Sequence, residues 1–323
     1  MTDSMRLLRL PWVAFPVAAF ALVFAGSFAY FRATAADPKA QATERKTGPA
    51  FASGGGRLVL ALHAVGSQEP AEAYLASAAV DGSDVREITQ PPEGAIAADG
   101  SPSVSPDGNT IAFARAIPGE SPRIYLVAID GSGLRRLTQG NSAEIQPVWS
   151  PDGTHIAFSR ADDEHFDLFV AGADGSGLTQ LTHTPLADED SCTWSPNGLQ
   201  LAFTRFLNDD EDVLAIDMDG SEQHPLIRGR HDDASPSWSP DGPRIAITRD
   251  GRIAVFSFEH FKVAFLTEAG TKKDTGPSWS PDGSRIVFTR DPGTIYVMNA
   301  DGSKLAKVPL DKPATAAVWE PAG

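Results

Sequence analysis

The chain has 323 residues, of which 41% are hydrophobic and 21% charged, a composition that suits one large globular unit and excludes a disordered or fibrous protein. Its formal net charge is −15, and residues 1–46 hold only three of the 42 acidic residues, so nearly all of the acidity lies after them. Such an acidic body repels nucleic acid and anionic lipid, and neither is expected as a partner.

The first predicted element is an N-terminal apolar helix. Residues 10–31 contain no charged residue, and 22 residues are enough to cross a hydrocarbon core of about 30 Å. Arg6 and Arg9 precede this run, so the positive-inside rule places everything after Arg32 on the periplasmic or extracellular side. We therefore expect residues 1–32 to act as a signal-anchor that leaves the protein anchored in the membrane.

A cleavable signal peptide is the alternative for this segment. Small residues surround Ala35, and cleavage near that position would release the protein as a secreted or periplasmic form. Residues 33–55 are rich in Ala, Gly and charge, which predicts a flexible tether. Cys192 is the only cysteine in the chain, so it forms no internal disulfide and no cysteine-based zinc site.

Residues 56–323 contain a unit that recurs every 40–45 residues. It reads Pro-x-Trp-Ser-Pro-Asp-Gly, followed by Ile-Ala-Phe-x-Arg, a third apolar segment that ends in Asp-Gly, and a short fourth segment. Copies of the first motif lie at 102–108, 147–153, 192–198, 236–242 and 277–283, with a degenerate copy at 317–323. Four short strands per unit at this period predict an all-β fold, a six-bladed β-propeller.

The two ends of the repeat region complement each other. The first unit starts directly at Arg57 and lacks a Trp-bearing strand, whereas the last motif, around Trp319, has no strands after it. We predict that the C-terminal strand completes the first blade, because this removes the open sheet edges that would otherwise remain.

The Trp-Ser-Pro-Asp-Gly repeat, with Ile-Ala-Phe-x-Arg and a later Asp-Gly-Ser-Gly, resembles the repeat of TolB-type propellers over residues 57–323. The resemblance implies the propeller fold and a place in the cell envelope, where TolB proteins work with Pal and TolA. The α/β domain that makes the TolA connection in that family has no counterpart in the short stretch between the apolar segment and the propeller.

A charge pair recurs with the blades. An acid stands three residues before the Pro position in five of them, and an Arg follows 16 residues after each acid. The hairpin of the first two strands should bring each acid beside its Arg, so we interpret the pairs as structural. They are Asp99 and Arg115, Glu144 and Arg160, Glu189 and Arg205, Asp233 and Arg249, and Asp274 and Arg290; the sixth blade has Ala314 and Leu62 at these positions.

Variable loops on a rigid frame are the usual place for recognition, and they lie at the end of the ring opposite the Ser-Pro-Asp-Gly turns. The candidate partner-binding face there is formed by Asp162, Asp163, Glu164, Asp188, Asp190, Asp209, Asp210, Arg230, His231 and Asp232. These residues suit an unidentified envelope protein or basic peptide, or a calcium ion bound across loops, and solubility alone is the competing interpretation. The propeller is expected to be monomeric.

Catalysis has little support in the sequence. There is no Gly-x-Ser-x-Gly elbow, no His-Glu-x-x-His and no phosphate-binding Gly-rich loop, so we predict no catalytic residue, no metal site and no cofactor. The alternative is a propeller enzyme, of hydrolase or lyase type, that uses a metal or acidic residues at the channel mouth.

Overall fold

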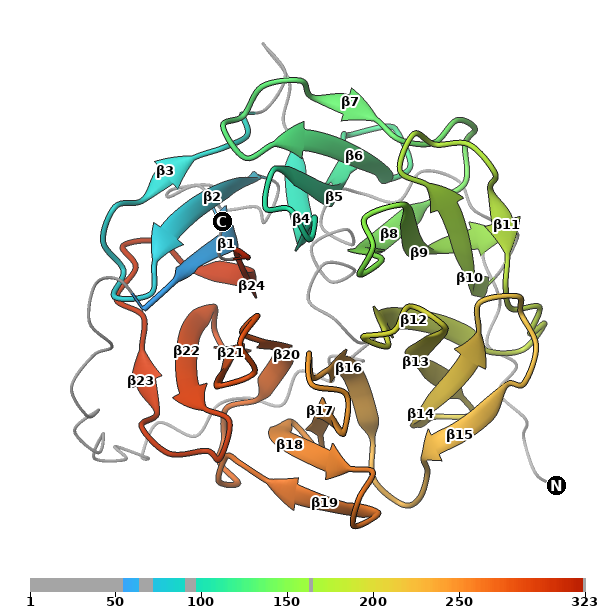
Figure 1. Cartoon of the computed structure of the whole chain (residues 1–323). Coiled ribbons are helices and arrows are strands. Elements are labelled where there is room, and N and C mark those ends of the chain that lie inside the picture. The colour runs from blue at the N-terminus through green and yellow to red at the C-terminus, as the bar shows by residue number, and fades with distance from the viewer. Residues whose placement is uncertain (1–54, 64–71, 91–96, 163–164, 322–323) are drawn as a thin grey trace, which may run out of the picture.

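The computed structural model describes residues 55–63, 72–90, 97–162 and 165–321. The predicted helix and signal-anchor (1–32), almost all of the predicted tether (33–55), and Asp163 and Glu164 lie outside these residues. The regular elements within these residues are all strands, as expected for an all-β protein. The described residues contain no helix long and apolar enough to span a membrane. The strands form sheets arranged in a ring around a central axis (Figure 1).

Hydrogen bonding groups the strands of the described residues into five sheets. The largest has eight strands: β24 (Ala314–Trp319), β1 (Arg57–His63), β2 (Ala73–Ala79), β3 (Arg86–Glu87), β4 (Ala98–Val104), β5 (Thr110–Ala116), β6 (Arg123–Ala128) and β7 (Arg135–Arg136). The next two sheets are β8 (Glu144–Trp149), β9 (His155–Asp162), β10 (His165–Gly172) and β11 (Thr179–Gln180), and β12 (Asp188–Trp194), β13 (Gln200–Leu207), β14 (Asp210–Asp217) and β15 (His224–Ile227). The last two are β16 (Asp233–Trp238), β17 (Arg244–Arg249), β18 (Arg252–Ser257) and β19 (Lys262–Phe265), and β20 (Asp274–Trp279), β21 (Arg285–Arg290), β22 (Thr294–Asn299) and β23 (Ala306–Lys307).

The sheet count differs from the six separate blades predicted above. The eight-stranded sheet consists of two antiparallel halves, one with β24, β1, β2 and β3 and one with β4 to β7. A single parallel pair, Ala73 with Ala98, joins the halves between β2 and β4. The sequence pattern gave no sign of this contact, because it lies where the chain passes from one repeat to the next.

The Ser-Pro-Asp-Gly turns connect the first two strands of each repeat by local hydrogen bonds. In the turn between β8 and β9, Ser150 Oγ donates to Asp152 Oδ1 at 2.6 Å, and the same oxygen accepts from Thr154 N at 3.0 Å. Gly153 has a φ of 71°, a conformation that glycine adopts without strain, and its N–H bonds to Ser150 O. These bonds lower the pKa of the Asp152 carboxyl to about 2.

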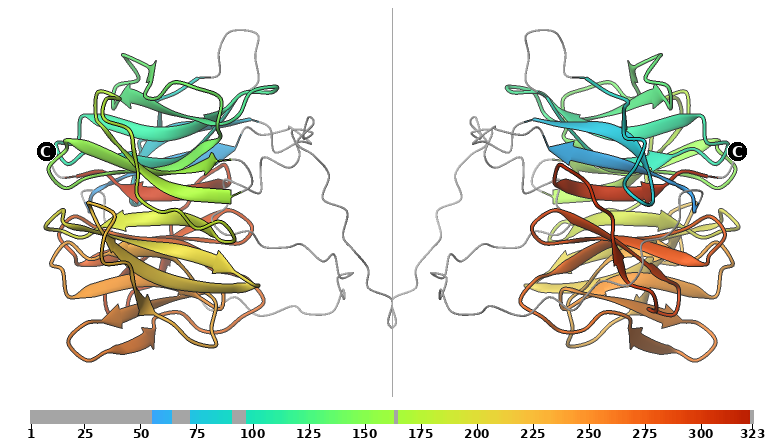
Figure 2. Two further views of the ribbon diagram at one scale, coloured as in Figure 1. Left: turned by 90° about the vertical axis from the view of Figure 1, so that its right-hand side faces the viewer. Right: turned by 90° about the vertical axis from the view of Figure 1, so that its left-hand side faces the viewer.

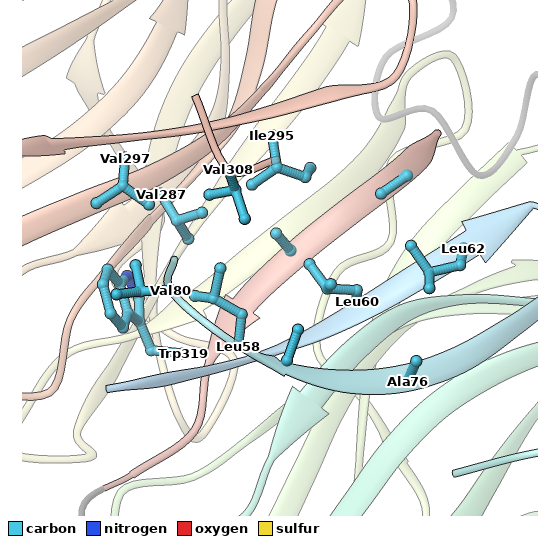
Figure 3. Packing of buried hydrophobic residues seen from close by; sticks show 13 residues of the cluster. Leu58, Leu60, Leu62, Ala76, Val80, Val287, Ile295, Val297, Val308 and Trp319 are labelled. Atoms are coloured by element: carbon cyan, nitrogen blue, oxygen red, sulfur yellow. The ribbon is translucent and has the colours of Figure 1, made fainter. Parts of the chain in front are cut away.

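The C-terminal strand closes the ring, as the sequence predicts. β24 pairs antiparallel with β1, with Trp319 opposite Leu58. Trp319 is 5% exposed and packs with Leu58, Val80 and Val287, in a cluster that joins the eight-stranded sheet to the β20–β23 sheet (Figure 3). Because this contact joins the last strand to the first, the closure depends on it.

Tryptophans of the first strands also connect neighbouring sheets. The indole Nε1 of Trp194, Trp279 and Trp319 donates to a backbone oxygen on the preceding sheet, of Val148, Ser237 and Ser278 respectively, at 3.0–3.1 Å. Trp238 differs, since its Nε1 bonds to Gly242 in its own turn. Arg244 and Arg285 lie over the rings of Trp279 and Trp319, each 4.6 Å from the centroid, which adds a cation–π contact.

The ring has two different faces. The turn-bearing face carries the Ser-Pro-Asp-Gly turns and the turns between third and fourth strands. The loop-bearing face carries the connections between second and third strands and the crossings from one sheet to the next. In side view the strands run between these two faces (Figure 2). The first strands, β4, β8, β12, β16, β20 and β24, line the centre of the ring.

Candidate functional site: the channel and the loop-bearing face

The channel along the ring axis encloses a cavity of about 370 Å³. Six strands contribute its wall, through the segments 101–104, 146–149, 191–193, 235–237, 275–278 and 315–319, together with Thr289. None of these described lining residues is Asp, Glu, Lys, Arg or His. The wall is therefore neutral and carries mainly hydroxyl groups, proline rings and two tryptophans.

A β-bulge in each of β4, β8, β12, β16 and β20 shapes this wall. One residue of each bulge has a φ between 49° and 60°, namely Ser101, Gln146, Ser191, Ser235 and Gly276. Left-handed conformations cost energy in residues other than glycine, and they persist only where the surrounding structure holds them. Gln146 and Ser191 show how, because the Gln146 side chain accepts from Ser191 N at 2.8 Å and donates to Ser191 Oγ at 3.0 Å.

Three of the five predicted acid and arginine pairs are close two-point contacts. In each, the Arg Nε and one terminal nitrogen donate to the two oxygens of one carboxylate at 2.5–2.7 Å. The pairs are Asp99 with Arg115, Asp233 with Arg249, and Asp274 with Arg290. The carboxylates are at most 2% exposed, and the hydrogen bonds raise the pKa of Arg249 and Arg290. Leu62 and Ala314, which replace a sixth pair, are likewise opposite each other in register.

The Glu144 and Arg160 pair is looser. The nearest charged atoms are 4.0 Å apart, and Glu144 Oε1 has no hydrogen-bond partner among the described residues. Thr138 Oγ1 donates to Glu144 Oε2 from the preceding sheet, and Thr89 Oγ1 makes the equivalent bond to Asp99 at 2.6 Å. Neither threonine is among the predicted site residues, although each follows an apolar residue, Ile88 or Leu137, that comes directly after a fourth strand.

The predicted pair of Glu189 with Arg205 is wrong. The two residues are opposite each other in register, yet no ion pair within 4.0 Å joins them in the described part of the chain. Glu189 instead turns to the preceding sheet, where its Oε1 accepts from Thr184 Oγ1 at 2.6 Å. Burial, partly opposed by threonine hydrogen bonds and reinforced by the Asp167 carboxyl, raises the pKa of Glu189 to about 7.

A group of acidic side chains lies at the loop-bearing end of β12 and β14. Burial and the charge of Asp188 raise the pKa of Asp190 to about 6. Burial and the charges of Asp190 and Asp232 raise the pKa of Glu211 to about 7, with Lys273 acting in the opposite direction. Asp190 Oδ1 has no hydrogen-bond partner among the described residues. This group, Asp190, Glu211 and Asp232, is called the acidic mouth below.

Other predicted face residues are partly occupied by local contacts. Asp188 accepts from Phe166 N at 2.9 Å and lies 3.6 Å from His165 Nδ1. His231 contacts Asp250 at 2.7 Å between Nδ1 and Oδ2. Asp209 and Arg230 are exposed and Asp210 is half-buried; Asp162 ends β9, and Asp163 and Glu164 lie outside the described residues. Asp190 and Asp232 thus both act on Glu211, whereas Asp188 and His231 bond elsewhere.

The described residues contain no group of three or more His, Cys, Asp or Glu side chains positioned to hold a metal ion. A calcium ion bound across loops, the option raised beside a protein partner, would need ligands beyond the acidic mouth. Cys192 lines the channel, and burial raises the pKa of its thiol to about 12, so it is present as the neutral thiol.

Comparison with known protein families gives a match over residues 30–240 to the TolB beta propeller domain. The match covers more than half of the chain. The chain belongs to the TolB β-propeller domain family. The motifs that carry this membership are the turns and apolar strands described above, which build the ring and its turn-bearing face.

Solved structures place this TolB-family propeller among proteins with different roles. TolB from Acinetobacter baumannii matches with a TM-score of 0.72 and 21% identity, over 84% of this chain and 68% of that one. A chain from a nidogen/laminin complex matches with a TM-score of 0.66 and 12% identity, over 82% and 98%. Oligogalacturonate lyase in complex with manganese matches with a TM-score of 0.54 and 16% identity, over 75% and 73%. At these identities the likeness concerns the fold alone.

Proposed function

We propose that this TolB-family propeller is a binding scaffold of the cell envelope whose loop-bearing face takes a protein or peptide segment with basic side chains. The observation that carries the proposal is the acidic mouth, where burial and the charges of Asp190 and Asp232, from two adjacent sheets, raise the pKa of Glu211. A positive side chain placed beside Glu211 and Asp232 would offset the negative charge gathered there.

The experiment uses a short lysine-rich peptide as the probe and calorimetry as the readout. Replacing Glu211 with Gln and Asp232 with Asn should weaken binding roughly tenfold, since a rim charge typically contributes up to about 1 kcal/mol. The matched control replaces Asp130 and Asp174 with Asn, which removes the same charge from turns on the turn-bearing face. Equal weakening in both variants, or no binding by the parent protein, would count against a specific face.

We infer that the protein binds rather than catalyses. The neutral wall of the channel supports this, because a lyase or hydrolase acting there would need an acid, a base or a metal ligand near the substrate. The test incubates the protein with oligogalacturonate and manganese, the combination suggested by the matching lyase, and follows the ultraviolet absorbance of unsaturated products. Turnover above that of a heat-inactivated sample would replace the binding hypothesis with the enzymatic one.

We further propose that residues 10–31 anchor the chain in the membrane, with the propeller on the periplasmic or extracellular side. The support is the uncharged run and the two arginines before it. Carbonate washing of membranes from cells that make the full chain should leave the protein in the pellet. Recovery in the soluble fraction with a new N-terminus near Ala35 would identify a cleaved signal peptide instead.

We also propose that the ring works as six blades, with the eight-stranded sheet counting as two. Its halves each have four antiparallel strands, and only the Ala73 and Ala98 pair joins them. Replacing Ala73 with Pro would remove the N–H that donates to Ala97 O at 3.3 Å, and it should leave the unfolding transition cooperative and nearly unchanged. A large loss of stability would indicate that the two halves depend on each other as one sheet.

A further inference from the structure

The boundary between the β8–β11 and β12–β15 sheets differs from its neighbour in one charge. The backbone N–H of Leu137 bonds to Ile124 O, and that of Leu181 bonds to Leu168 O, so Arg123 and Asp167, just before these acceptors, occupy equivalent positions. Arg123 interacts electrostatically with Glu144, the acid of the next sheet. At the following boundary a carboxylate, Asp167, takes the place of that guanidinium.

Asp167 and Glu189 are both buried, at 7% and 0% exposed. Asp167 is well supplied with donors, since it accepts from Gln180 Nε2 at 3.0 Å, Thr182 Oγ1 at 3.1 Å and Thr184 N at 3.2 Å. Glu189 receives one bond from the Thr184 hydroxyl, and its Oε2 has no partner in the described residues.

Both carboxyl groups are buried and bond to the same residue, Thr184, and burial together with a neighbouring carboxylate charge opposes ionisation of the second group. Asp167 accepts three hydrogen bonds, whereas one oxygen of Glu189 has no partner in the described residues, so the geometry assigns the proton to Glu189. The raised pKa of Glu189, caused first by burial, agrees with this assignment. Glu189 is therefore the neutral member of the pair at mildly acidic pH.

An alternative partner for Glu189 lies on its own sheet. Arg205 is opposite Glu189 in register, at the position of the arginines that grip Asp99, Asp233 and Asp274. Its guanidinium makes no hydrogen bond or ion pair within the described residues, and its charge helps to lower the raised pKa of Asp212. Arg205 is thus placed to form an ion pair with Glu189 like those of the other sheets, but the pair is not formed in this structure.

We propose that Asp167 and Glu189 share one proton across this boundary. When the proton is released to solvent, the Glu189 carboxylate leaves Thr184 and forms an ion pair with Arg205. The chain segment 182–188, which crosses between the sheets, is held by both carboxylates through Thr182 and Thr184. Its end, Asp188, borders the candidate binding face through Phe166 and His165. Proton release therefore alters the loop-bearing face, a consequence that depends on the proposed function, whereas the proton sharing itself does not.

Other charged groups surround the pair on every adjoining element. They are Arg160 on β9, His165 on β10, His183 in the crossing segment, Asp188 and Asp190 on β12, Arg205 on β13, and Asp212 on β14. Asp190 and Glu211 also have raised pKa values, so the pH dependence of the parent protein has more than one source. The test must therefore compare variants.

The first experiment follows the Glu189 carboxyl by carbon NMR across pH in the full chain. A midpoint near 7 is expected, and Asp167→Asn should lower it by about one unit or more because the competing charge is gone. A Glu189 midpoint at the ordinary value for a glutamate, or one that Asp167→Asn leaves in place, would overturn the proposal.

The second experiment measures the melting temperature, without any ligand, at about pH 5.5 and about pH 8. Arg205→Leu should leave the parent value unchanged at the lower pH and reduce it by a few degrees at the higher pH, where the Glu189 pair has formed. Arg249→Leu is the control, and it should lower the melting temperature at both. Equal effects of Arg205→Leu at the two pH values would overturn the transfer to Arg205.

The third experiment repeats the lysine-rich peptide titration at the same two pH values. A change in affinity that Glu189→Gln abolishes would extend the proton release to the binding face. If the peptide fails to bind at all while the first two experiments give the expected results, the proposed function fails and the proton sharing stands.

Discussion

The two ends of the first strands follow different rules. At the turn-bearing end, tryptophan indoles on β12, β20 and β24 make the same bond to the preceding sheet. At the loop-bearing end, the acids that begin these strands range from the two-point contact of Asp233 to the unpaired Glu189. A repeat therefore places the same residue types at both ends of the strands, while the contacts that they make still vary, as Trp238 and Trp149 show at one end and Glu189 at the other.

The strongest test of the regular end is Trp319→Ala. Trp319 is 5% exposed, donates to Ser278 O and joins the last strand to the first, so its removal should cost about 3–5 kcal/mol in the free energy of unfolding. The comparison variant is Trp149→Ala, where the indole is only partly buried and its Nε1 has no partner among the described residues. Denaturant unfolding should give a clearly smaller loss for Trp149. Equal losses would mean that the closing contact of Trp319 stabilises the fold no more than Trp149 does.

The divergent end is tested by two double-mutant cycles. For Asp233→Ala and Arg249→Leu, either single change leaves a buried charge unpaired and should cost up to about 3–5 kcal/mol, and the double variant should cost much less than the sum. For Glu189→Ala and Arg205→Leu at about pH 6, the coupling should be below about 0.5 kcal/mol, because no pair exists to break. Strong coupling in the second cycle would show that Glu189 and Arg205 form an ion pair, as Asp233 and Arg249 do.

The sequence predicted the regular contacts because they depend on fixed spacing. Two strands joined by a short turn place residues 16 apart opposite each other, so Asp99 and Arg115 could be paired without a structure. Trp319 could be assigned to the first blade because the repeat count left one strand missing at each end. The same logic failed for Glu189, since its neighbour across the sheet boundary, Asp167, belongs to another repeat and no spacing rule relates the two.

The channel wall was also beyond sequence reasoning. Ser101, Gln146 and Ser235 adopt left-handed conformations within strands, and such residue types carry no signal for a bulge there. The threonines that bond to the acid of the next sheet, Thr89 and Thr138, looked like ordinary ends of strands. In each case the deciding interaction crosses between elements whose relative placement follows only from the folded ring.

The smallest expected effect concerns the turns at the regular end. In the β12–β13 turn the Asp position is Asn197, whose Oδ1 accepts from Ser195 Oγ at 2.7 Å and from Leu199 N at 3.1 Å. Asp152 makes the same two kinds of bond in its own turn, so Asp152→Asn, combined with Asp282→Asn, should keep the turns and change stability at neutral pH by less than about 0.5 kcal/mol.

The effect should appear in acid. The folded pKa of Asp152 and Asp282 is about 2, below the ordinary value of 3.8, so each carboxylate stabilises the fold above that value and loses this contribution as the pH falls toward 2. The double variant lacks these groups, and its melting temperature should therefore fall less than that of the parent between about pH 4 and pH 2. Parallel acid titration curves would show that the turn carboxylates are energetically equivalent to Asn197 at every pH, because only a charge-dependent bond can separate the two proteins in this range.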